Sequence, residues 1–144
     1  MQKIQPYTRK VHFYETDQMG IVHHSNYIRW FEEARVDFLE QAGYGYEKAT
    51  LCGIDIGVAG VVCDYKSMVR FGDTVNVNLH ITELKNASME VSYTVCDAST
   101  GEVRATGKTK HFYFDRNNSR LVSLKKALPE LYDIFASHIQ DTAN

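Results

Sequence analysis

The sequence predicts an α+β fold in which one long amphipathic helix covers an antiparallel β-sheet. Apolar residues recur every three or four positions over residues 25–42, which is the spacing of a helix with one buried face. From residue 54 to residue 114 apolar residues instead alternate with polar ones, which is the period of half-buried strands. The helical and strand-like segments are segregated along the chain, which indicates an α+β rather than an α/β protein.

The expected long helix at about residues 25–42 has one apolar face. Trp30 lies at the margin of this face and widens it. The face itself consists of Tyr27, Ile28, Phe31, Ala34, Phe38, Leu39 and Ala42.

The ends of this helix are marked by residues that favour caps. Ser25 or Asn26 is expected as the N-cap, and Gly43 as the C′ residue that ends the helix. Residues 46–53 follow closely and are expected to form a short second helix.

The expected strands are joined by short turns and are therefore antiparallel neighbours in a meander. The face formed by Val75, Val77, Leu79 and Ile81 is expected to pack against the apolar face of the long helix. Leu121 and Val122 are expected as a short extension, and Pro129 as the first residue of a closing helix. The strands are expected at residues 7–14, from 54 to about 70, at 75–81, at 89–95 and at about 102–114.

Composition narrows the class of protein. The 144 residues suit a single domain, with 44% hydrophobic residues, 24% charged residues and a net charge of −2. There is no basic excess to hold the phosphates of a nucleic acid, and no apolar run approaches the ~20 residues of a membrane span. The three cysteines have no metal-ligand spacing and are odd in number, so we expect neither a disulfide framework nor a zinc site, and a cytoplasmic setting.

The stretch TDQMGIVHHSNYIRWFEEAR, residues 16–35, is the most specific motif. Its informative positions are Asp17, Gly20, Ile21, Val22, His23, His24, Asn26 and Tyr27. This pattern resembles the hotdog-fold acyl-CoA thioesterases, in the 4-hydroxybenzoyl-CoA thioesterase-like branch that includes the YbgC-type enzymes. Residues 33–35 (EAR) and 69–75 (VRFGDTV) also resemble the family.

The resemblance implies a curved antiparallel sheet wrapped around the long helix. It also implies a homodimer, often a homotetramer built from dimers, with the site at the dimer interface and an acyl-CoA thioester as substrate. Some YbgC-type enzymes carry a tyrosine four residues before the aspartate. That position is Phe13 here, so any role of such a hydroxyl does not transfer, although Tyr14 is adjacent.

Asp17 is the candidate catalytic group. A carboxylate close to a helix N-terminus is stabilised in its charged form, and it can attack a thioester as a nucleophile or activate water as a general base. The sequence does not choose between these two roles. The structural alternative is that Asp17 only caps the turn in TDQMG, which is a common use of aspartate.

The start of the helix is expected to polarise the thioester. The first N–H groups of a helix lack internal partners, and those around residues 24–26 can point at a carbonyl oxygen. The resemblance assigns this role to the backbone N–H of His24, and the His24 side chain either assists by hydrogen bonding or proton transfer or simply lines the pocket. A metal bound by His23 and His24 is not expected, because adjacent side chains rarely converge on one ion.

The remaining positions of the motif are expected to line the substrate site or to support it. Gly20 allows a positive φ or a close approach of ligand, and His23 is a packing residue. Asn26 either caps the helix or bonds the acidic loop, with capping as the default, and Tyr27 belongs to the helix core. The expected substrate-binding set is Gly20, Val22, His23, Asn26 and Tyr27.

Three further predictions concern charged and thiol groups. Glu32 or Glu33 is the reserve catalytic carboxylate, while Glu33 and Arg35 are expected in ion pairs. Cys63 is expected as a small buried apolar residue rather than a nucleophile. The cations available to coenzyme A phosphates are Lys66, Arg70, Arg104, Lys108, Lys110 and Arg116.

The function predicted from these residues and the resemblance is acyl-CoA thioester hydrolysis, without a metal or redox cofactor. One alternative is hydrolysis of acyl groups from acyl carrier protein by the same acid and helix. Another is a module that binds acyl thioesters without cleaving them. A lyase acting on hydroxyacyl thioesters is disfavoured because hotdog dehydratases use other motifs.

Overall fold

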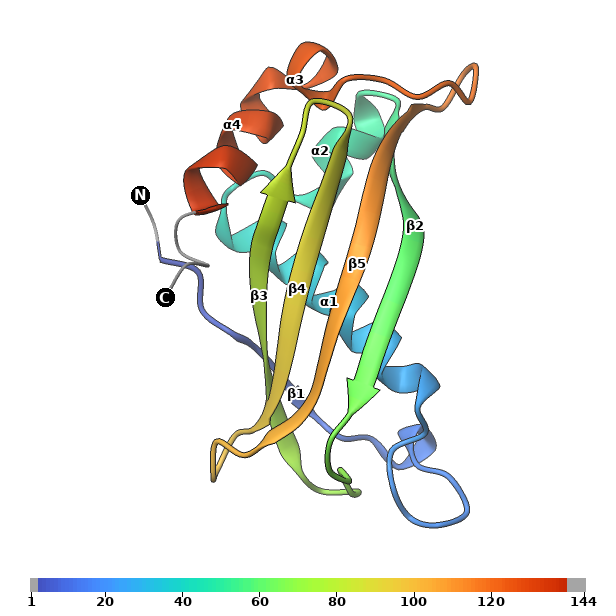
Figure 1. Cartoon of the computed structure of the whole chain (residues 1–144), viewed down its shortest axis with the longest axis vertical. Coiled ribbons are helices and arrows are strands. Elements are labelled where there is room, and N and C mark those ends of the chain that lie inside the picture. The colour runs from blue at the N-terminus through green and yellow to red at the C-terminus, as the bar shows by residue number, and fades with distance from the viewer. Residues whose placement is uncertain (1–2, 140–144) are drawn as a thin grey trace.

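The computed structural model describes residues 3–139, which form one antiparallel five-stranded sheet and four α-helices (Figure 1). The strand order is β1-β3-β4-β5-β2. The strands are β1 (Tyr7–Lys10), β2 (Ile54–Tyr65), β3 (Thr74–Leu84), β4 (Ser88–Asp97) and β5 (Val103–Asp115). The predicted class, with an antiparallel sheet covered by one long helix, is confirmed.

The pairing of β2 differs from a simple meander. Strands β3, β4 and β5 follow one another, but β2 pairs with β5 and lies at the edge of the sheet. The segment between β2 and β3 instead contacts the loop before the long helix, through a bridge between Ile21 and Arg70. The expectation that β2 lies beside β3 was wrong, because hydrogen bonds between segments distant in sequence decide this pairing.

The N-terminal strand is also shorter than predicted. It ends at Lys10, and Phe13–Glu15 form a 3-10 helix. The Glu15 side chain accepts a hydrogen bond from the His12 backbone N–H at 2.7 Å. This local hydrogen bond turns the chain where the alternating pattern predicted continued strand.

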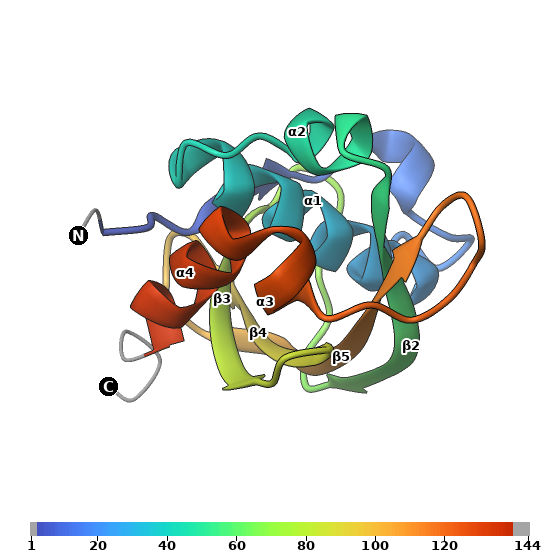
Figure 2. The ribbon, with the colours of Figure 1, turned by 90° about the horizontal axis from the view of Figure 1, so that it is seen from above.

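The long helix α1 (Ser25–Gln41) lies within the curve of the sheet (Figure 2). Gly43 has φ +81°, and the next residue, Tyr44, donates its N–H to the carbonyl of Leu39, which confirms Gly43 as the C′ residue. One detail of the predicted apolar face was wrong, because Ile28 is 42% exposed. Trp30, predicted at the margin of this face, is fully buried, and its Nε1 donates to Glu15 of the N-terminal segment.

Three shorter helices complete the chain: α2 (Tyr46–Leu51), α3 (Leu124–Ala127) and α4 (Pro129–His138). α2 and α4 were predicted, and Pro129 starts α4 as expected. α3 was not predicted. It begins at the side chain of Ser123, which accepts a hydrogen bond from the N–H of Lys126. The Leu121 extension is present as an isolated bridge to Phe114.

The close packing of α1 on the sheet depends on a glycine, Gly107. Phe31 of α1 stacks on Tyr93 of β4, with ring centroids 4.2 Å apart and an interplanar angle of 11°. The same Phe31 ring covers Gly107 of β5, where a Cβ atom would overlap it and would approach the Val62 carbonyl oxygen to 2.9 Å. The absence of a side chain at position 107 therefore lets the helix pack closely.

Replacing Gly107 with alanine is expected to destabilise the fold by about 1–3 kcal/mol, because Phe31 must leave its position on Tyr93. Urea unfolding monitored by tryptophan fluorescence measures the change. Gly60→Ala is the matched control, since the nearest atom to a Cβ there is Lys110 Cβ at 3.9 Å. An equal loss of stability in both variants would contradict the packing argument.

Candidate active site

The predicted catalytic residue Asp17 lies in a tight loop between β1 and α1. Its backbone N–H donates to the carbonyl of Ile21 at 2.8 Å, and its carbonyl accepts from the N–H of Gly20 at 2.9 Å. Its carboxylate oxygen Oδ1 accepts from the N–H of Met19 at 2.8 Å. The capping role expected as the structural alternative is therefore present. Since this bond uses Oδ1, Oδ2 is available for chemistry.

Gly20 closes this loop in a left-handed conformation. Its φ is +76°, and a Cβ built at this position would have no atom within 4 Å. The positive φ, and not lack of space, is thus the reason for glycine here, as one of the two predicted explanations states.

The loop is joined to the body of the protein on its far side. Val22 donates its N–H to the carbonyl of Val69 at 2.8 Å, and its side chain is buried in the core. Thr16 and Val22 form a bridge across the base of the loop. These contacts close the loop of residues 16–22, which comes immediately before α1 in the chain (Figure 1).

Glu15 anchors the start of this loop to the helix, and only 2% of it is exposed. Its carboxylate accepts hydrogen bonds from the His12 N–H, from Trp30 Nε1 at 2.7 Å and from Arg9 Nη2 at 3.0 Å. Its backbone carbonyl accepts the N–H of His23 at 2.9 Å. One residue thus links β1, the loop and α1.

The electrostatics of Glu15 follow from these contacts. Burial alone would raise the pKa of the carboxyl group, but the hydrogen bonds from His12, Trp30 and Arg9, with the positive charge of Arg9, outweigh it and lower the pKa. Glu15 is therefore charged in the folded protein and acts as a structural group. The sequence analysis did not identify it, since a glutamate in a polar turn gives no signal of burial.

The start of α1 differs from the predicted capping. His24 is the N-cap residue and makes no side-chain cap, whereas Ser25 is the first helical residue. Asn26 donates its side-chain N–H to the Glu15 carbonyl at 2.8 Å, which is the alternative to capping. The ring Nδ1 of His23 accepts from the Ser25 N–H at 3.2 Å, so an imidazole takes part of the capping role.

The backbone N–H of His24 fits the predicted role in polarising a carbonyl. Among residues 3–139 it has no hydrogen-bond acceptor, and His24 is exposed. The His24 carbonyl accepts the Tyr65 hydroxyl at 2.9 Å, which connects the helix start to the end of β2. The rings of His23 and His24 stack with centroids 4.1 Å apart.

Tyr27 lies in the core, as the sequence predicted. Its ring contacts those of Trp30 and Tyr65 at 5.0 Å in each case. Burial raises the pKa of Tyr27 to about 12 and that of Tyr65 to about 12. Both hydroxyls therefore stay protonated and can donate hydrogen bonds, but they cannot act as bases near neutral pH.

Two cavities flank α1. A polar cleft of about 550 Å³ lies along the N-terminal half of the helix, and Asp17 and His24 are outside its lining. The lining residues are Arg9, Tyr14, Glu15, Thr16, His23, Ser25, Asn26, Arg29, Glu32 and Glu33.

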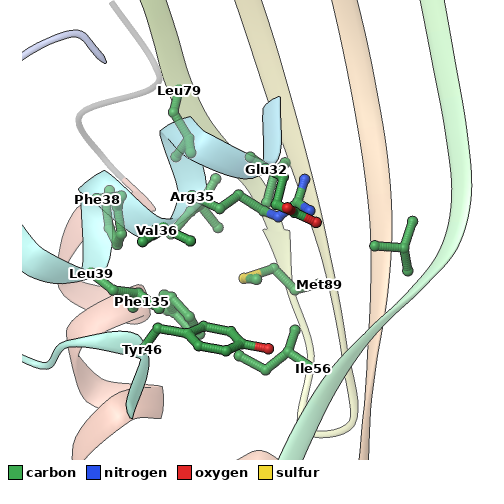
Figure 3. A pocket seen from close by; sticks show the side chains of 13 residues that line it. Glu32, Arg35, Val36, Phe38, Leu39, Tyr46, Ile56, Leu79, Met89 and Phe135 are labelled. Atoms are coloured by element: carbon green, nitrogen blue, oxygen red, sulfur yellow. The ribbon is translucent and has the colours of Figure 1, made fainter. Parts of the chain in front are cut away.

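The second cavity is mostly apolar, has a volume of about 270 Å³ and lies between α1 and the sheet (Figure 3). Its apolar walls come from α1, α4 and strands β2, β3 and β4, including Met89 and Ile56. Its polar groups are Glu32, Arg35 and Tyr46. An organic acyl group fits a site of this kind, with apolar walls and few polar groups.

The predicted ion pairs of α1 are half correct. Glu33 lies 3.5 Å from Arg9, as an ion pair, but Arg35 instead donates to the Tyr93 hydroxyl at 2.9 Å.

Cys63 is partly buried, and burial raises the pKa of its thiol, so it is a poor nucleophile.

Only part of the predicted cationic set is available to bind phosphates. Arg104 pairs with Asp97 at 3.2 Å and with Glu102 at 2.9 Å. Lys108 pairs with Glu90. Arg116 also has a carboxylate partner, Asp55, at 2.7 Å. Within the part of the chain that the structure describes, the members of the set without an ion pair are Lys66, Arg70 and Lys110.

The sequence pattern of the thioesterase-like superfamily matches residues 11–132, and the chain belongs to this superfamily. Its sheet, curled around one long helix, is the hotdog fold, and its class of activity is thioester hydrolysis.

Particular relatives are similar over nearly the whole chain. A crystal structure of a hypothetical protein from Aquifex aeolicus is 37% identical, covers 90% of this chain and 97% of its own, and has a TM-score of 0.82. The 1,4-dihydroxy-2-naphthoyl-CoA hydrolase of Crocosphaera subtropica is 25% identical over 86% of this chain and 92% of the hydrolase. The DHNA-CoA thioesterase of Staphylococcus aureus, 24% identical, shares the fold over 97% of this chain and 93% of its own, with a TM-score of 0.90.

None of the helices between residues 3 and 139 is long and apolar enough to cross a membrane.

Glu15→Gln is expected to destabilise the protein by about 3 kcal/mol, since it leaves the largely buried Arg9 without its closest carboxylate. The charge of Glu15 stabilises the fold above its unfolded pKa of about 4.3, and this contribution is lost as the pH falls through the lower folded pKa. Urea unfolding at several pH values should show that the variant lacks this acid-dependent loss.

The matched control is Glu33→Gln, because Glu33 contacts the same arginine but its side chain is 37% exposed. We expect it to cost less than about 1 kcal/mol. Hydrogen exchange should show faster opening of residues 11–24 in Glu15→Gln alone. Equal effects of the two variants would contradict the anchoring role of Glu15.

Proposed function

We propose that this protein hydrolyses acyl-CoA thioesters, with Asp17 as the catalytic carboxylate and the start of α1 as the oxyanion site. The observation that carries the proposal is a His24 N–H without an acceptor among residues 3–139, at the start of a helix that follows the closed loop carrying Asp17. The similarity to a naphthoyl-CoA hydrolase supports coenzyme A as the carrier of the acyl group.

In the proposed mechanism, the thioester oxygen accepts the His24 N–H at the positive end of the helix dipole. This stabilises the negative charge that develops on the oxygen when the carbonyl is attacked, and one such donor typically contributes about 3–4 kcal/mol. Asp17 Oδ2 either attacks the carbonyl carbon directly or removes a proton from the attacking water. Direct attack breaks the carbon–sulfur bond, releases the coenzyme A thiolate and leaves a mixed anhydride with Asp17, which water then hydrolyses to the free acid. Attack by water breaks the same bond and gives the free acid directly, and the proton that Asp17 removed passes to the thiolate.

The other motif residues support this site in the proposal. Gly20 shapes the loop, Val22 fixes it to the core, and Asn26 holds the Glu15 carbonyl. Tyr27 fixes Tyr65, whose hydroxyl binds the His24 carbonyl. The imidazoles of His23 and His24 are exposed at the helix start and contact the bound thioester.

We also propose that the active form is a cytoplasmic homodimer, or a homotetramer built from such dimers. Within residues 3–139, β2 pairs with β5 on one side, has no partner strand on its other edge, and exposes Val58, Val61, Val62 and Tyr65. An exposed apolar edge is a liability in an isolated chain, and pairing with a second copy covers it. The same pairing would enclose the site, because Tyr65 contacts the helix start.

If β2 forms the dimer interface, Val62→Lys should weaken association by about tenfold or more and shift the sedimentation profile toward monomer. The physical reason is that two added charges would face each other across the pairing edges. Thr94→Lys, in the centre of the outer sheet face, is the control and should not change assembly. An unchanged profile for Val62→Lys would exclude β2 from the interface.

Asp17→Asn is expected to lower kcat by about 10²–10⁴-fold while fold and assembly persist. Asparagine keeps an oxygen that can accept the Met19 N–H, so the change removes only the charge. The assay is thiol release from a panel of short, branched, aromatic and long acyl-CoAs. Asp73→Asn is the control, because Asp73 also accepts a turn N–H, from Arg70.

Turnover close to that of the unmodified protein in Asp17→Asn would remove Asp17 from the mechanism. The same acyl chain presented on acyl carrier protein distinguishes the two carriers. Binding of acyl-CoA without thiol release from any member of the panel would indicate a non-catalytic module.

A further inference from the structure

Arg35 is a partly buried cation without a carboxylate partner. Arg9 and Arg104 are similarly buried, and each of them pairs with aspartate or glutamate. Within residues 3–139, no acidic side chain lies at ion-pair distance from Arg35. An uncompensated guanidinium in apolar surroundings is costly, so a site of this kind favours an anion.

The Arg35 side chain is held in a defined orientation. Its Nη1 donates to the Tyr93 hydroxyl at 2.9 Å, and this hydroxyl also bonds Thr109 on the neighbouring strand. Thr109 bonds the ring Nε2 of His111 at 2.7 Å. This buried chain of hydrogen bonds occupies one nitrogen of the guanidinium and leaves Nη2 and Nε without partners among the described residues.

The environment of Arg35 is the apolar cavity between α1 and the sheet. Figure 3 shows its side chain extending along the cavity toward Glu32, with Met89 and Ile56 on the opposite wall. His111 lies next to Met89 across the strands, and burial, with the charge of Arg35, lowers its pKa to about 4. His111 is therefore neutral near pH 7, and Arg35 supplies the positive charge of this group.

We propose that this cavity receives the acyl part of the substrate and that Arg35 binds a carboxylate at its far end. The substrate class is then the coenzyme A monothioester of a dicarboxylic acid. This inference rests on the proposed function. Arg35 is a specificity-determining residue in it, since a guanidinium can hold a planar carboxylate with two parallel hydrogen bonds.

The position of Arg35 agrees with an acyl group that starts at the helix N-terminus. Ten residues separate Ser25 from Arg35, or about 15 Å along the axis, and helical side chains lean back toward the N-terminus. Residues on the inner face of β2 lie between the two places. Tyr65 contacts the helix start, Val61 follows on the same face, and Val58 lines the cavity.

Glu32 is the competing feature of the cavity. It lies one turn before Arg35 but is exposed, so solvent screens its charge at the rim. If Glu32 were the recognition group, the protein would prefer a terminal hydroxyl that donates to it. If Arg35 binds a carboxylate, the negative charge of Glu32 repels that carboxylate, so Glu32→Gln should modestly improve turnover of carboxylated substrates.

The test compares acyl groups of equal length in the thiol-release assay. Adipyl-, suberyl- and sebacyl-CoA are paired with hexanoyl-, octanoyl- and decanoyl-CoA, and 10-hydroxydecanoyl-CoA is added. The unmodified protein should favour the carboxylated member of at least one pair. Arg35→Met should lower kcat/KM for that member by about 10- to 100-fold, mainly through KM, and change its methyl-terminated partner little.

Arg35→Lys should recover part of this preference, because it keeps the charge but not the two parallel bonds. Tyr93→Phe gives a second variant that keeps the Arg35 charge, and it should reduce the preference several-fold by releasing the Arg35 side chain. Arg120→Met, in an exposed loop, is the control and should leave all rates unchanged. Thermal unfolding confirms that each variant is folded.

Calorimetric titration with free adipate separates this inference from the proposed function. Adipate binding that Arg35→Met abolishes, without hydrolysis of any thioester, would refute the function but support the carboxylate site. Hydrolysis without a preference for carboxylated chains would refute the site but support the function. A preference for the hydroxyl-terminated chain, or equal losses for all substrates in Arg35→Met, would also overturn the carboxylate proposal.

Discussion

The arrangement of the candidate site depends on the hydrogen bonds of one buried residue, Glu15. Its carboxylate accepts hydrogen bonds from Arg9 of β1, the His12 N–H and the Trp30 indole, and its backbone carbonyl accepts one from the Asn26 side chain. A buried charge is stable only when its hydrogen bonds are satisfied, and every donor around Glu15 has a fixed position. The loop that carries Asp17 therefore starts from a defined point beside α1, as the proposed site requires.

The sheet and the helix provide the frame for this contact. Phe31 packs over Gly107 and against Tyr93, which brings α1 close to β4 and β5. The same close packing does not extend to β2, whose inner face remains partly exposed beside the apolar cavity. Close packing on one side of the helix thus provides stability, and the other side leaves the cavity in which the proposed function places an acyl group.

Two polar groups beside the same helix, the buried Glu15 and the partly buried Arg35, differ in how completely their hydrogen bonds are satisfied. Glu15 has a cation and several N–H donors, and its low pKa reflects them. Arg35 has one hydroxyl partner and unused donors in an apolar cavity. The first system therefore behaves as structure, and the second has the properties of a binding site.

Much of the fold was accessible from local patterns, because its signals involve residues close in sequence. The 3.6-residue spacing located α1, Gly43 marked its end, and the period of two located β3, β4 and β5. In the candidate site, the pattern from Asp17 to Tyr27 indicated the family, and the positive φ of Gly20 followed from its place in a turn. These features arise from backbone geometry and from which face of an element is apolar.

Contacts between distant segments decided the rest. No local pattern shows that Glu15 is buried, that Ile28 is exposed, or that an imidazole and not a hydroxyl assists the start of α1. The pairing of β2 with β5 and the missing carboxylate at Arg35 likewise depend on which segments meet in space. The amino-acid order sets the local conformation and the apolar faces, whereas the pairing of buried polar groups depends on desolvation, which exists only once the chain has packed.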